Sequence, residues 1–225
     1  MPSLYIKKNK EVYNAIASHF SHTRLHLWDD KVPLRRYAKD GDRILDIGCG
    51  NGRLYQLFDG LSIAYAGADH SEALIDIAKK KYPSGIFIVS DMTKLPFPNE
   101  SFDVIFCIAV FHHLPTEKTR MSAVREMKRV LKKNGRVVMM NWNLLRSQKS
   151  LVFSQKSKKP IHTIVPWKDS KGKVLGERHY WALSPLYLDA MFRKAGFIVE
   201  EQYYMKRGER SDEKNGENLL SIVKN

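Results

Sequence analysis

Short apolar runs alternate with amphipathic stretches through most of this chain. From residue 43 the apolar runs predict strands over 43–47, 62–68, 85–89, 102–110 and 136–142. The stretches between them predict helices over 53–58, 71–81 and 116–133, the second capped by Ser71 and the third ended by Asn134-Gly135. Because strands that alternate with helices form βαβ units, we expect a parallel sheet with helices on both faces.

The alternation is absent before residue 40 and pauses after residue 143. Residues 1–40 place apolar side chains at three- and four-residue steps, which is typical of helix. After the pause we expect a helix over 184–195 and two strands, 197–204 and 218–223, joined by a polar turn as an antiparallel hairpin at the sheet edge. The predicted organisation is an N-terminal helical cap (1–40) and one α/β domain (41–225) that carries an insertion (144–182).

The insertion is strongly basic. The chain has 38 Lys and Arg against 24 Asp and Glu, a formal net charge of +14, and the insertion contributes half of that charge. Such a patch favours an anionic partner, most often nucleic acid or a membrane surface, although a lysine-rich surface can also serve solubility alone.

Hydropathy and cysteine usage narrow the class of protein. Hydrophobic residues make up 43% of the chain, and the longest apolar run, Val104–Phe111, is too short to span a membrane. The N-terminal residues lack the apolar stretch of a signal peptide. Cys49 and Cys107 are far apart and form no CxxC pair, which argues against a zinc site and a disulfide framework. We therefore expect a cytoplasmic protein.

A glycine-rich loop, Asp46–Gly52, follows the first strand and opens a helix. Gly48 and Gly50 let the backbone approach a ligand closely, with Asn51 beside them at a helix N-terminus. The spacing is G-x-G-x-G, whereas a dinucleotide site requires G-x-G-x-x-G. Asp46, which begins this segment, precedes the glycines and would repel a pyrophosphate. The loop therefore suits a ligand with a cationic group.

Acidic residues end the next two strands as well. Asp69 follows the second strand and can accept both hydroxyls of a ribose, while Asp91 and Met92 follow the third and suit an exocyclic amine and a purine face. Asp46, Asp69 and Asp91 are spaced by 23 and 22 residues, and this register resembles the class I methyltransferases that use S-adenosylmethionine. The resemblance implies a seven-stranded sheet in the order 3-2-1-4-5-7-6. The alternative is that Asp69 and Asp91 only cap loops.

The fourth strand ends at Ala109 and leads to His112-His113. In class I methyltransferases this strand end faces the methionine arm of the cofactor and the methyl acceptor, and Ala109 is small enough for the cofactor to lie against the backbone. Neighbouring residues of a strand point to opposite sides, so we expect one histidine, His113, to face the pocket. Three further histidines share one face of the N-terminal region, but no carboxylate or cysteine completes a metal site, and no metal is predicted; they are His19, His22 and His26.

Several segments together resemble one branch of this superfamily, the tRNA wobble-uridine methyltransferases that esterify 5-carboxymethyluridine, including the methyltransferase domain of the eukaryotic AlkB-like fusion. The matching segments are residues 12–24, the glycine loop, 108–113, 141–142, 164–167 and 178–180. The resemblance implies that Tyr13 and Phe20 cap the cofactor and that Arg24, His113 and Trp142 line the nucleoside pocket. It also implies that the insertion contacts the anticodon arm of tRNA, and that a small zinc-binding activator subunit is a possible partner.

An ester-forming reaction agrees with the chemistry of these side chains. A carboxylate acceptor is already ionised at neutral pH, so no general base is required. Arg24 can hold one carboxylate oxygen while Trp142 stacks on the uracil, whereas an amine or hydroxyl acceptor would need a base, for which His113 is the candidate. Two alternatives stay open: a small-molecule methyltransferase of the same fold, and a non-catalytic RNA-binding or partner-stabilising protein.

Overall fold

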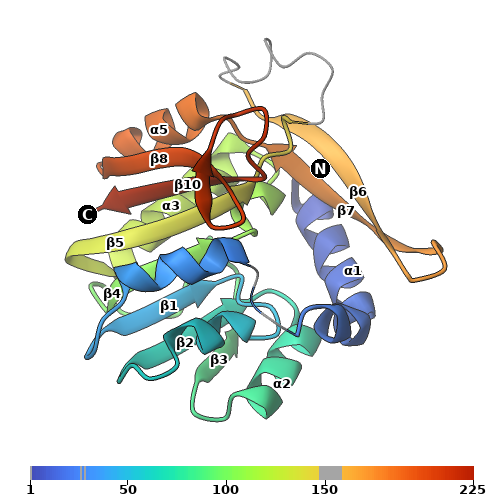
Figure 1. Ribbon diagram of the computed structural model, residues 1–225, viewed down its shortest axis with the longest axis horizontal. Coiled ribbons are helices and arrows are strands. Elements are labelled where there is room, and N and C mark those ends of the chain that lie inside the picture. Colours follow the sequence, from blue (N-terminus) through green and yellow to red (C-terminus); the bar gives the residue numbers. More distant parts are fainter. Residues whose placement is uncertain (1, 26, 28, 147–158) are drawn as a thin grey trace.

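The computed structural model describes residues 2–25, 27, 29–146 and 159–225, and an eight-stranded sheet forms its centre (Figure 1). Its strands are β1 (Arg43–Ile47), β2 (Ala64–Asp69), β3 (Ile86–Val89), β4 (Phe102–Ile108), β5 (Leu131–Trp142), β8 (Ile198–Lys206), β9 (Glu209–Ser211) and β10 (Asn218–Lys224). They lie in the order β3-β2-β1-β4-β5-β10-β8-β9, and β10 runs antiparallel to both β5 and β8. The predicted order is confirmed, with the short strand β9 added at the edge.

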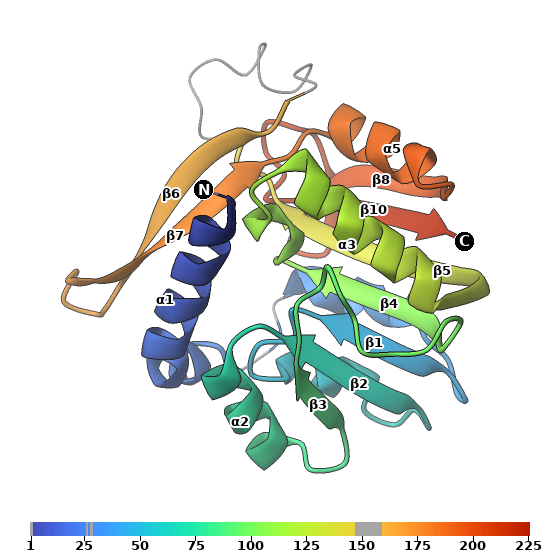
Figure 2. The same cartoon turned by 180° about the vertical axis from the view of Figure 1, so that it is seen from behind.

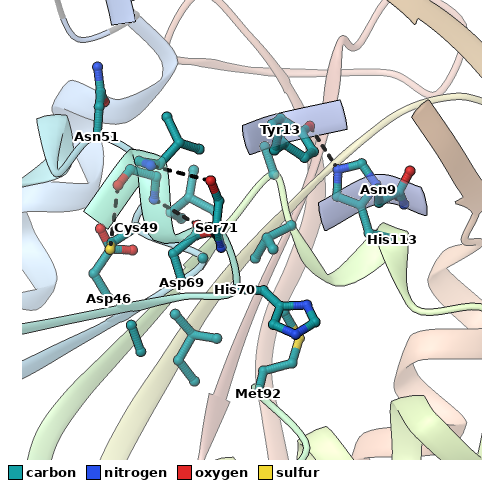
Figure 3. A pocket seen from close by; sticks show the side chains of 18 of the residues that line it. Asn9, Tyr13, Asp46, Cys49, Asn51, Asp69, His70, Ser71, Met92 and His113 are labelled. Carbon is teal, nitrogen blue, oxygen red and sulfur yellow. Dashed lines mark hydrogen bonds between the residues drawn. The ribbon is translucent and has the colours of Figure 1, made fainter. Parts of the chain in front are cut away.

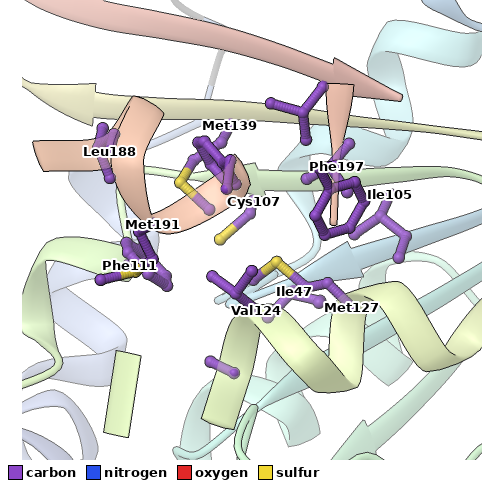
Figure 4. Packing of buried hydrophobic residues seen from close by; sticks show 14 of the residues in the cluster. Ile47, Ile105, Cys107, Phe111, Val124, Met127, Met139, Leu188, Met191 and Phe197 are labelled. Atoms are coloured by element: carbon purple, nitrogen blue, oxygen red, sulfur yellow. The ribbon is translucent and has the colours of Figure 1, made fainter. Parts of the chain in front are cut away.

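Helices cover both faces of the sheet, as the alternation predicts. Figure 2 shows α3 (Glu117–Val130) and α5 (Pro185–Lys194) on one face, where their apolar side chains pack against β4 and β5 (Figure 4). The short helices η1 (Asp29–Tyr37) and η2 (Arg53–Phe58) cover the opposite face. Strand β4 is therefore buried on both sides, which explains its unbroken apolar sequence.

Three helices begin where a hydroxyl side chain satisfies an unpaired backbone N–H. Ser71 accepts from the N–H of Leu74 at the start of α2 (Glu72–Lys81), and Ser184 caps α5 in the same way. Thr116 caps α3 by accepting from the backbone N–H of Thr119. These caps hold each helix at a fixed point after the preceding strand or loop.

The predicted end of the third helix is wrong. Helix α3 ends at Val130, and the chain enters β5 at once, pairing Leu131 with Phe102. Asn134 adopts a left-handed conformation with φ of 63°. A Cβ at Gly135 would lie 2.8 Å from the carbonyl oxygen of Asp103. Asn134 and Gly135 therefore form a bend within β5. The helix ends earlier than predicted because the pairing of β5 with β4 outweighs the helical propensity of residues 131–133.

A second, two-stranded sheet projects from the domain beside α1 (Pro2–Thr23), as Figures 1 and 2 both show. It is the hairpin of β6 (Ile161–Lys168) and β7 (Val174–Ala182), within the predicted insertion, where the sequence predicted only a pause. Residues 147–158 of the insertion, with Lys149, Lys156 and Lys158, lie outside the described residues. None of the described helices is long and apolar enough to cross a membrane.

Candidate functional site

A cavity lies at the carboxyl ends of the central strands, and α1 and the hairpin close it on the other side (Figure 3). All the site residues predicted from the sequence line this cavity: Tyr13, Phe20, Arg24, Asp46, Gly48, Gly50, Asn51, Asp69, Asp91, Met92, Ala109, His113 and Trp142. Residues without a predicted role line it too, among them Asn9, Lys31, Arg53, Trp167 and Arg178. The fold thus gathers side chains from both ends of the sequence around one space.

The glycine loop keeps its shape through left-handed residues that only glycine adopts easily. Gly48 has φ of 73°, and its N–H donates to the carbonyl of Ala68 over 2.7 Å. A Cβ at this position would lie 2.4 Å from Cγ2 of Val110. Gly50, with φ of 55°, donates its N–H to Oδ2 of Asp69 over 2.9 Å. The loop therefore needs glycine for close approach to the neighbouring strand end.

Asp69 and Asp91 each hold their own loop and also line the cavity. Oδ1 of Asp69 accepts from the N–H of Ser71 over 2.8 Å, and burial raises the pKa of its carboxyl. Oδ1 of Asp91 accepts from the backbone N–H and the hydroxyl of Thr93, both over 2.8 Å. Loop capping and exposure to the cavity coexist here, because each carboxylate has further lone pairs. Together with Asp46 and the glycine loop, these residues form what we call the acidic end.

Asp46 is the most enclosed carboxylate of the acidic end, with 2% of its surface exposed. The hydroxyl of Tyr65 donates to its Oδ2 over 2.6 Å. Burial raises the pKa of Asp46, while Tyr65 and the nearby Lys31 act in the opposite direction. Burial, reinforced by Arg53, lowers the pKa of Lys31. Sequence reasoning missed Lys31 and Arg53, because neither belongs to a motif and lysine is ordinarily exposed.

Helix α1 is fastened to the acidic end by amide side chains. Asn51 of the glycine loop donates through Nδ2 to the hydroxyl of Ser21 over 3.1 Å. Asn14 accepts from the hydroxyl of Ser71 over 2.6 Å and donates to Oε2 of Glu72 over 2.9 Å. These bonds hold the helix across the mouth of the glycine loop.

His113 has three contacts at its ring nitrogens, and the two shortest define its tautomer. The third is with Nδ2 of Asn9, which lies 3.2 Å from Nδ1 but donates to the carbonyl of His179 over 2.9 Å. Nδ1 of His113 lies 2.9 Å from the carbonyl oxygen of His179, which only accepts, so in the neutral ring Nδ1 carries the proton. Its Nε2 then accepts from the hydroxyl of Tyr13 over 3.0 Å, the contact dashed in Figure 3. Burial, with a smaller contribution from the charge of Arg178, lowers the pKa of His113 to about 4, although the hydrogen bond with the carbonyl of His179 acts in the opposite direction. The ring is neutral at pH 7, and both nitrogens are engaged.

His112 faces away from the cavity, as the sequence predicts. It is fully buried, and its Nδ1 accepts from the N–H of Trp142 over 3.3 Å. The two histidines lie in the short helix η3 (Phe111–His113) rather than on a strand. Among the described residues no group of three or more potential ligands could hold a metal ion, and His26 lies outside the described residues.

A second part of the cavity wall is aromatic and cationic. Trp142 stacks on Tyr180 with ring centroids 5.2 Å apart and planes at 15°. The guanidinium carbons of Arg24 and Arg178 lie 5.3 and 4.8 Å from the ring centroid of Trp167. We call these five residues the guanidinium end. Arg178 and Trp167 were noted in the sequence only as parts of matching segments.

Curated relatives match most of this chain. Residues 45–139 fit the family model described as a methyltransferase domain. The tRNA (carboxymethyluridine(34)-5-O)-methyltransferase of Saccharomyces cerevisiae is 32% identical over 163 residues, 72% of this chain and 57% of that protein. The protein of the same name from Schizosaccharomyces pombe is 34% identical over 157 residues, 70% of this chain and 66% of that protein. The matched part thus spans less than two thirds of either relative.

Solved structures resemble the whole chain. A chain from the complex between the Haloferax volcanii Trm112 methyltransferase activator and a methyltransferase superposes with a TM-score of 0.70 at 19% identity, covering 96% of both chains. The CcbJ methyltransferase from Streptomyces caelestis superposes with a TM-score of 0.73 at 16% identity, covering 96% of this chain and 98% of its own. At these identities the likeness concerns the fold alone.

Proposed function

The chain belongs to the class I S-adenosylmethionine-dependent methyltransferases, and on this premise we propose that it forms the methyl ester of 5-carboxymethyluridine at the wobble position of tRNA. The names of its curated relatives support this substrate. The chemistry of the guanidinium end supports it independently, as the following observations explain.

The acidic end suits S-adenosylmethionine. The left-handed Gly48 and Gly50 leave the loop backbone accessible from the cavity. Ala109 also has a positive φ, 56°, and contributes only a methyl group to the cavity wall. Asp69 and Asp91 still offer carboxylate oxygens to hydroxyl and amine donors, and Met92 offers an apolar surface. Tyr13 and Phe20 meet edge to face with centroids 5.9 Å apart and would cover the cofactor from α1. When bound, S-adenosylmethionine supplies an electrophilic methyl group.

One observation carries the choice of acceptor: the histidine beside the guanidinium end is not available as a base. His113 is neutral, its Nδ1 proton is donated to a carbonyl, and its Nε2 accepts from Tyr13. An amine or hydroxyl acceptor has to lose a proton to such a base. A carboxylate acceptor does not, and the positive charges of Arg24 and Arg178 favour it.

The side chains then act mainly by alignment. Trp142, already stacked on Tyr180, offers an indole wall for the uracil, and Arg24 offers a guanidinium for the carboxylate. Methyl transfer is a direct displacement that needs its reacting atoms about 3–3.5 Å apart, so holding the acceptor still is the principal catalytic contribution of these residues.

The hairpin supports tRNA as the partner. Lys168, Lys171 and Lys173 are exposed near its tip, beside the cavity wall formed by β7. Cations placed there would contact the phosphates of the anticodon arm while the wobble base enters the cavity.

Strand β3 supports the proposal of an activator subunit. It is the terminal strand of the sheet, and its Ile86 and Val89 are 65% and 45% exposed. An apolar edge strand can accept a strand from a partner.

A cytoplasmic location stays a prediction. The two unpaired cysteines, Cys49 and Cys107, would suit the reducing conditions of that compartment.

The test is nucleoside mass spectrometry on bulk tRNA after incubation with the protein and methyl-labelled S-adenosylmethionine, with and without an activator subunit. We expect a new methyl group on 5-carboxymethyluridine that mild alkali removes, and its loss with Arg24→Ala and Trp142→Ala. If no nucleoside is methylated although the protein binds S-adenosylhomocysteine, the acceptor is a small molecule. If S-adenosylhomocysteine does not bind either, the protein is non-catalytic.

A further inference from the structure

Arg178 is a buried guanidinium whose hydrogen bonding is incomplete. The residue is 5% exposed, and its Nε has no hydrogen-bond partner in the described part of the chain. No ion pair joins it to a carboxylate of the described residues. A buried donor without a partner costs about 1–3 kcal/mol, and more when it is charged. Since Arg178 also lines the cavity, its natural partner is a bound anion.

The fold holds this guanidinium in a fixed place. Arg178 lies on the same face of β7 as Gly176 and Tyr180, because strand residues alternate between faces. Gly176 allows β7 to approach α1, since a Cβ there would lie 2.7 Å from Cγ1 of Val12. The guanidinium carbon then lies 4.8 Å from the ring centroid of Trp167, 5.4 Å from Tyr180 and 5.9 Å from Trp142.

Aromatic rings hold a cation but do not neutralise it. Burial and, to a smaller extent, the charge of Arg178 lower the pKa of His113 and of Arg24, and an anion bound between these groups relieves that repulsion. Glu177, the adjacent acid, is exposed on the opposite face of the strand. The guanidinium end is therefore a site with excess positive charge.

We propose that Arg178 binds the carboxylate of the methyl acceptor and makes the enzyme specific for an acid over the corresponding amide; this inference rests on the proposed function. Arg178 suits the role better than Arg24 alone, because Nη1 of Arg24 already donates to the carbonyl of Thr23 over 3.1 Å. A carboxylate accepts from a guanidinium at two positions, whereas an amide offers one acceptor and turns donors toward the cation.

The same contact distinguishes substrate from product. Attack by one carboxylate oxygen on the methyl group forms a C–O bond and breaks the bond between the methyl carbon and sulfur, whose electron pair stays on the departing thioether. The acceptor loses its negative charge in this step, and the sulfonium loses its positive charge. The neutral ester keeps the uracil contacts but loses the ion pair with Arg178, so it binds more weakly than the acid.

The experiment compares two acceptors and two variants. Competition by the nucleosides 5-carboxymethyluridine and 5-carbamoylmethyluridine is measured against tRNA, and kcat and KM are measured separately for wild type, Arg178→Gln and Arg178→Lys. Loss of a buried charge contact costs about 2–5 kcal/mol, so we expect kcat/KM to fall at least about 30-fold in Arg178→Gln, mainly through KM, with less loss in Arg178→Lys. The preference for acid over amide should disappear in Arg178→Gln.

Two controls separate this inference from other causes. Binding of S-adenosylhomocysteine reports whether a variant is folded, and Lys79→Gln removes one positive charge at an exposed position of α2, outside the cavity and the hairpin. If wild type does not methylate tRNA that carries 5-carboxymethyluridine, the proposed function fails. If wild type does so and Arg178→Gln keeps the preference for the acid, the role of Arg178 is overturned and the proposed function stands.

A measurement on wild type decides the case if Arg178→Gln does not fold. In protein labelled with ¹⁵N-arginine, the Nε–H signal of Arg178 is assigned from its absence in Arg178→Lys. We expect 5-carboxymethyluridine to shift this signal and the carbamoyl nucleoside to leave it in place. Binding of the acid without any shift would overturn the proposal.

Discussion

The two ends of the cavity are built by different means. At the acidic end, backbone N–H groups and carboxylates come from the carboxyl ends of β1, β2 and β3, three adjacent strands, and from the loops that follow them. At the guanidinium end, side chains come from the residue that follows α1, from β5 and from the hairpin, which are far apart in sequence. On the proposed function, the comparison teaches that the sheet itself supplies the cofactor site, whereas elements added to the sheet supply the acceptor site.

The largest effect is expected from Gly48→Ala, which alters the acidic end alone. A left-handed alanine costs about 1–2 kcal/mol, and contact with Val110 adds about 1–3 kcal/mol, so the free energy of unfolding should fall by about 2–5 kcal/mol. A loop that shifts to relieve this contact should also bind S-adenosylhomocysteine more weakly in titration calorimetry. Gly60→Ala is the matched control, since Gly60 has φ of 80° but no neighbour within 4 Å of a Cβ. Equal losses in the two variants would contradict a role for close approach.

The pH dependence of stability should have opposite signs at the two ends. The folded pKa of His113, about 4, lies below the unfolded value near 6.5, so its contribution is present above pH 6.5 and is lost as pH falls toward 4. The folded pKa of Asp69 is raised above 3.8, so its contribution is present below that pH and is lost as pH rises through the folded value.

Urea denaturation of two variants between pH 4 and 7 measures this difference. Relative to wild type, His113→Gln should gain about 1–3 kcal/mol as the pH falls from 6.5 to 4, and Asp69→Asn should gain as the pH rises from about 4. Parallel trends in the two variants would show that the ends do not differ in this respect.

Tyr13→Phe should affect the guanidinium end and spare the acidic end. The change removes the donor to Nε2 of His113 and costs about 1–2 kcal/mol, so kcat/KM on tRNA should fall about 5- to 20-fold. Affinity for S-adenosylhomocysteine should stay within about twofold, since the ring remains. Tyr5→Phe is the control on the same helix, where Tyr5 meets His162 and His179 through its ring. A large loss of cofactor affinity in Tyr13→Phe would show that the hydroxyl of Tyr13 acts at the acidic end instead.

The smallest effect concerns the hairpin lysines. Replacing Lys171 with Gln should make the dependence of log K for tRNA on log salt shallower by about 0.7–0.9, and cofactor affinity should not change. Lys79→Gln, exposed near the end of α2, should leave the salt dependence unchanged. Equal slopes in the two variants would exclude the hairpin from phosphate contact.

The sequence predicted the acidic end well because its chemistry is local. Asp46, Asp69 and Asp91 each lie at or just after the end of a strand whose apolar pattern is clear, so their meeting at one sheet edge follows from the alternation. The error at Asn134-Gly135 has a tertiary cause, since the pairing of β5 with β4 decides where α3 ends.

The guanidinium end was harder to predict because burial there depends on long-range packing. Nothing local in the sequence indicates that Arg178 is enclosed, since lysine and arginine in a basic insertion are ordinarily solvated. Its burial follows from the docking of β7 on α1 at Gly176, and that contact joins segments with no shared periodic pattern. Lys31 was missed for the same reason.

The bond between Asn9 and His179 has a consequence for synthesis on the ribosome. The Nδ2 of Asn9 donates to the carbonyl of His179 over 2.9 Å, and its Oδ1 accepts from the N–H of the same residue over 2.8 Å. The two residues are separated by 170 positions, so α1 leaves the ribosome long before β7, the strand to which it is hydrogen-bonded. At about 5–20 residues per second, that interval is roughly 10–30 s. During this time the three aspartates of the acidic end are all synthesised before Arg178, so the residues of the acidic end are complete before those of the guanidinium end are.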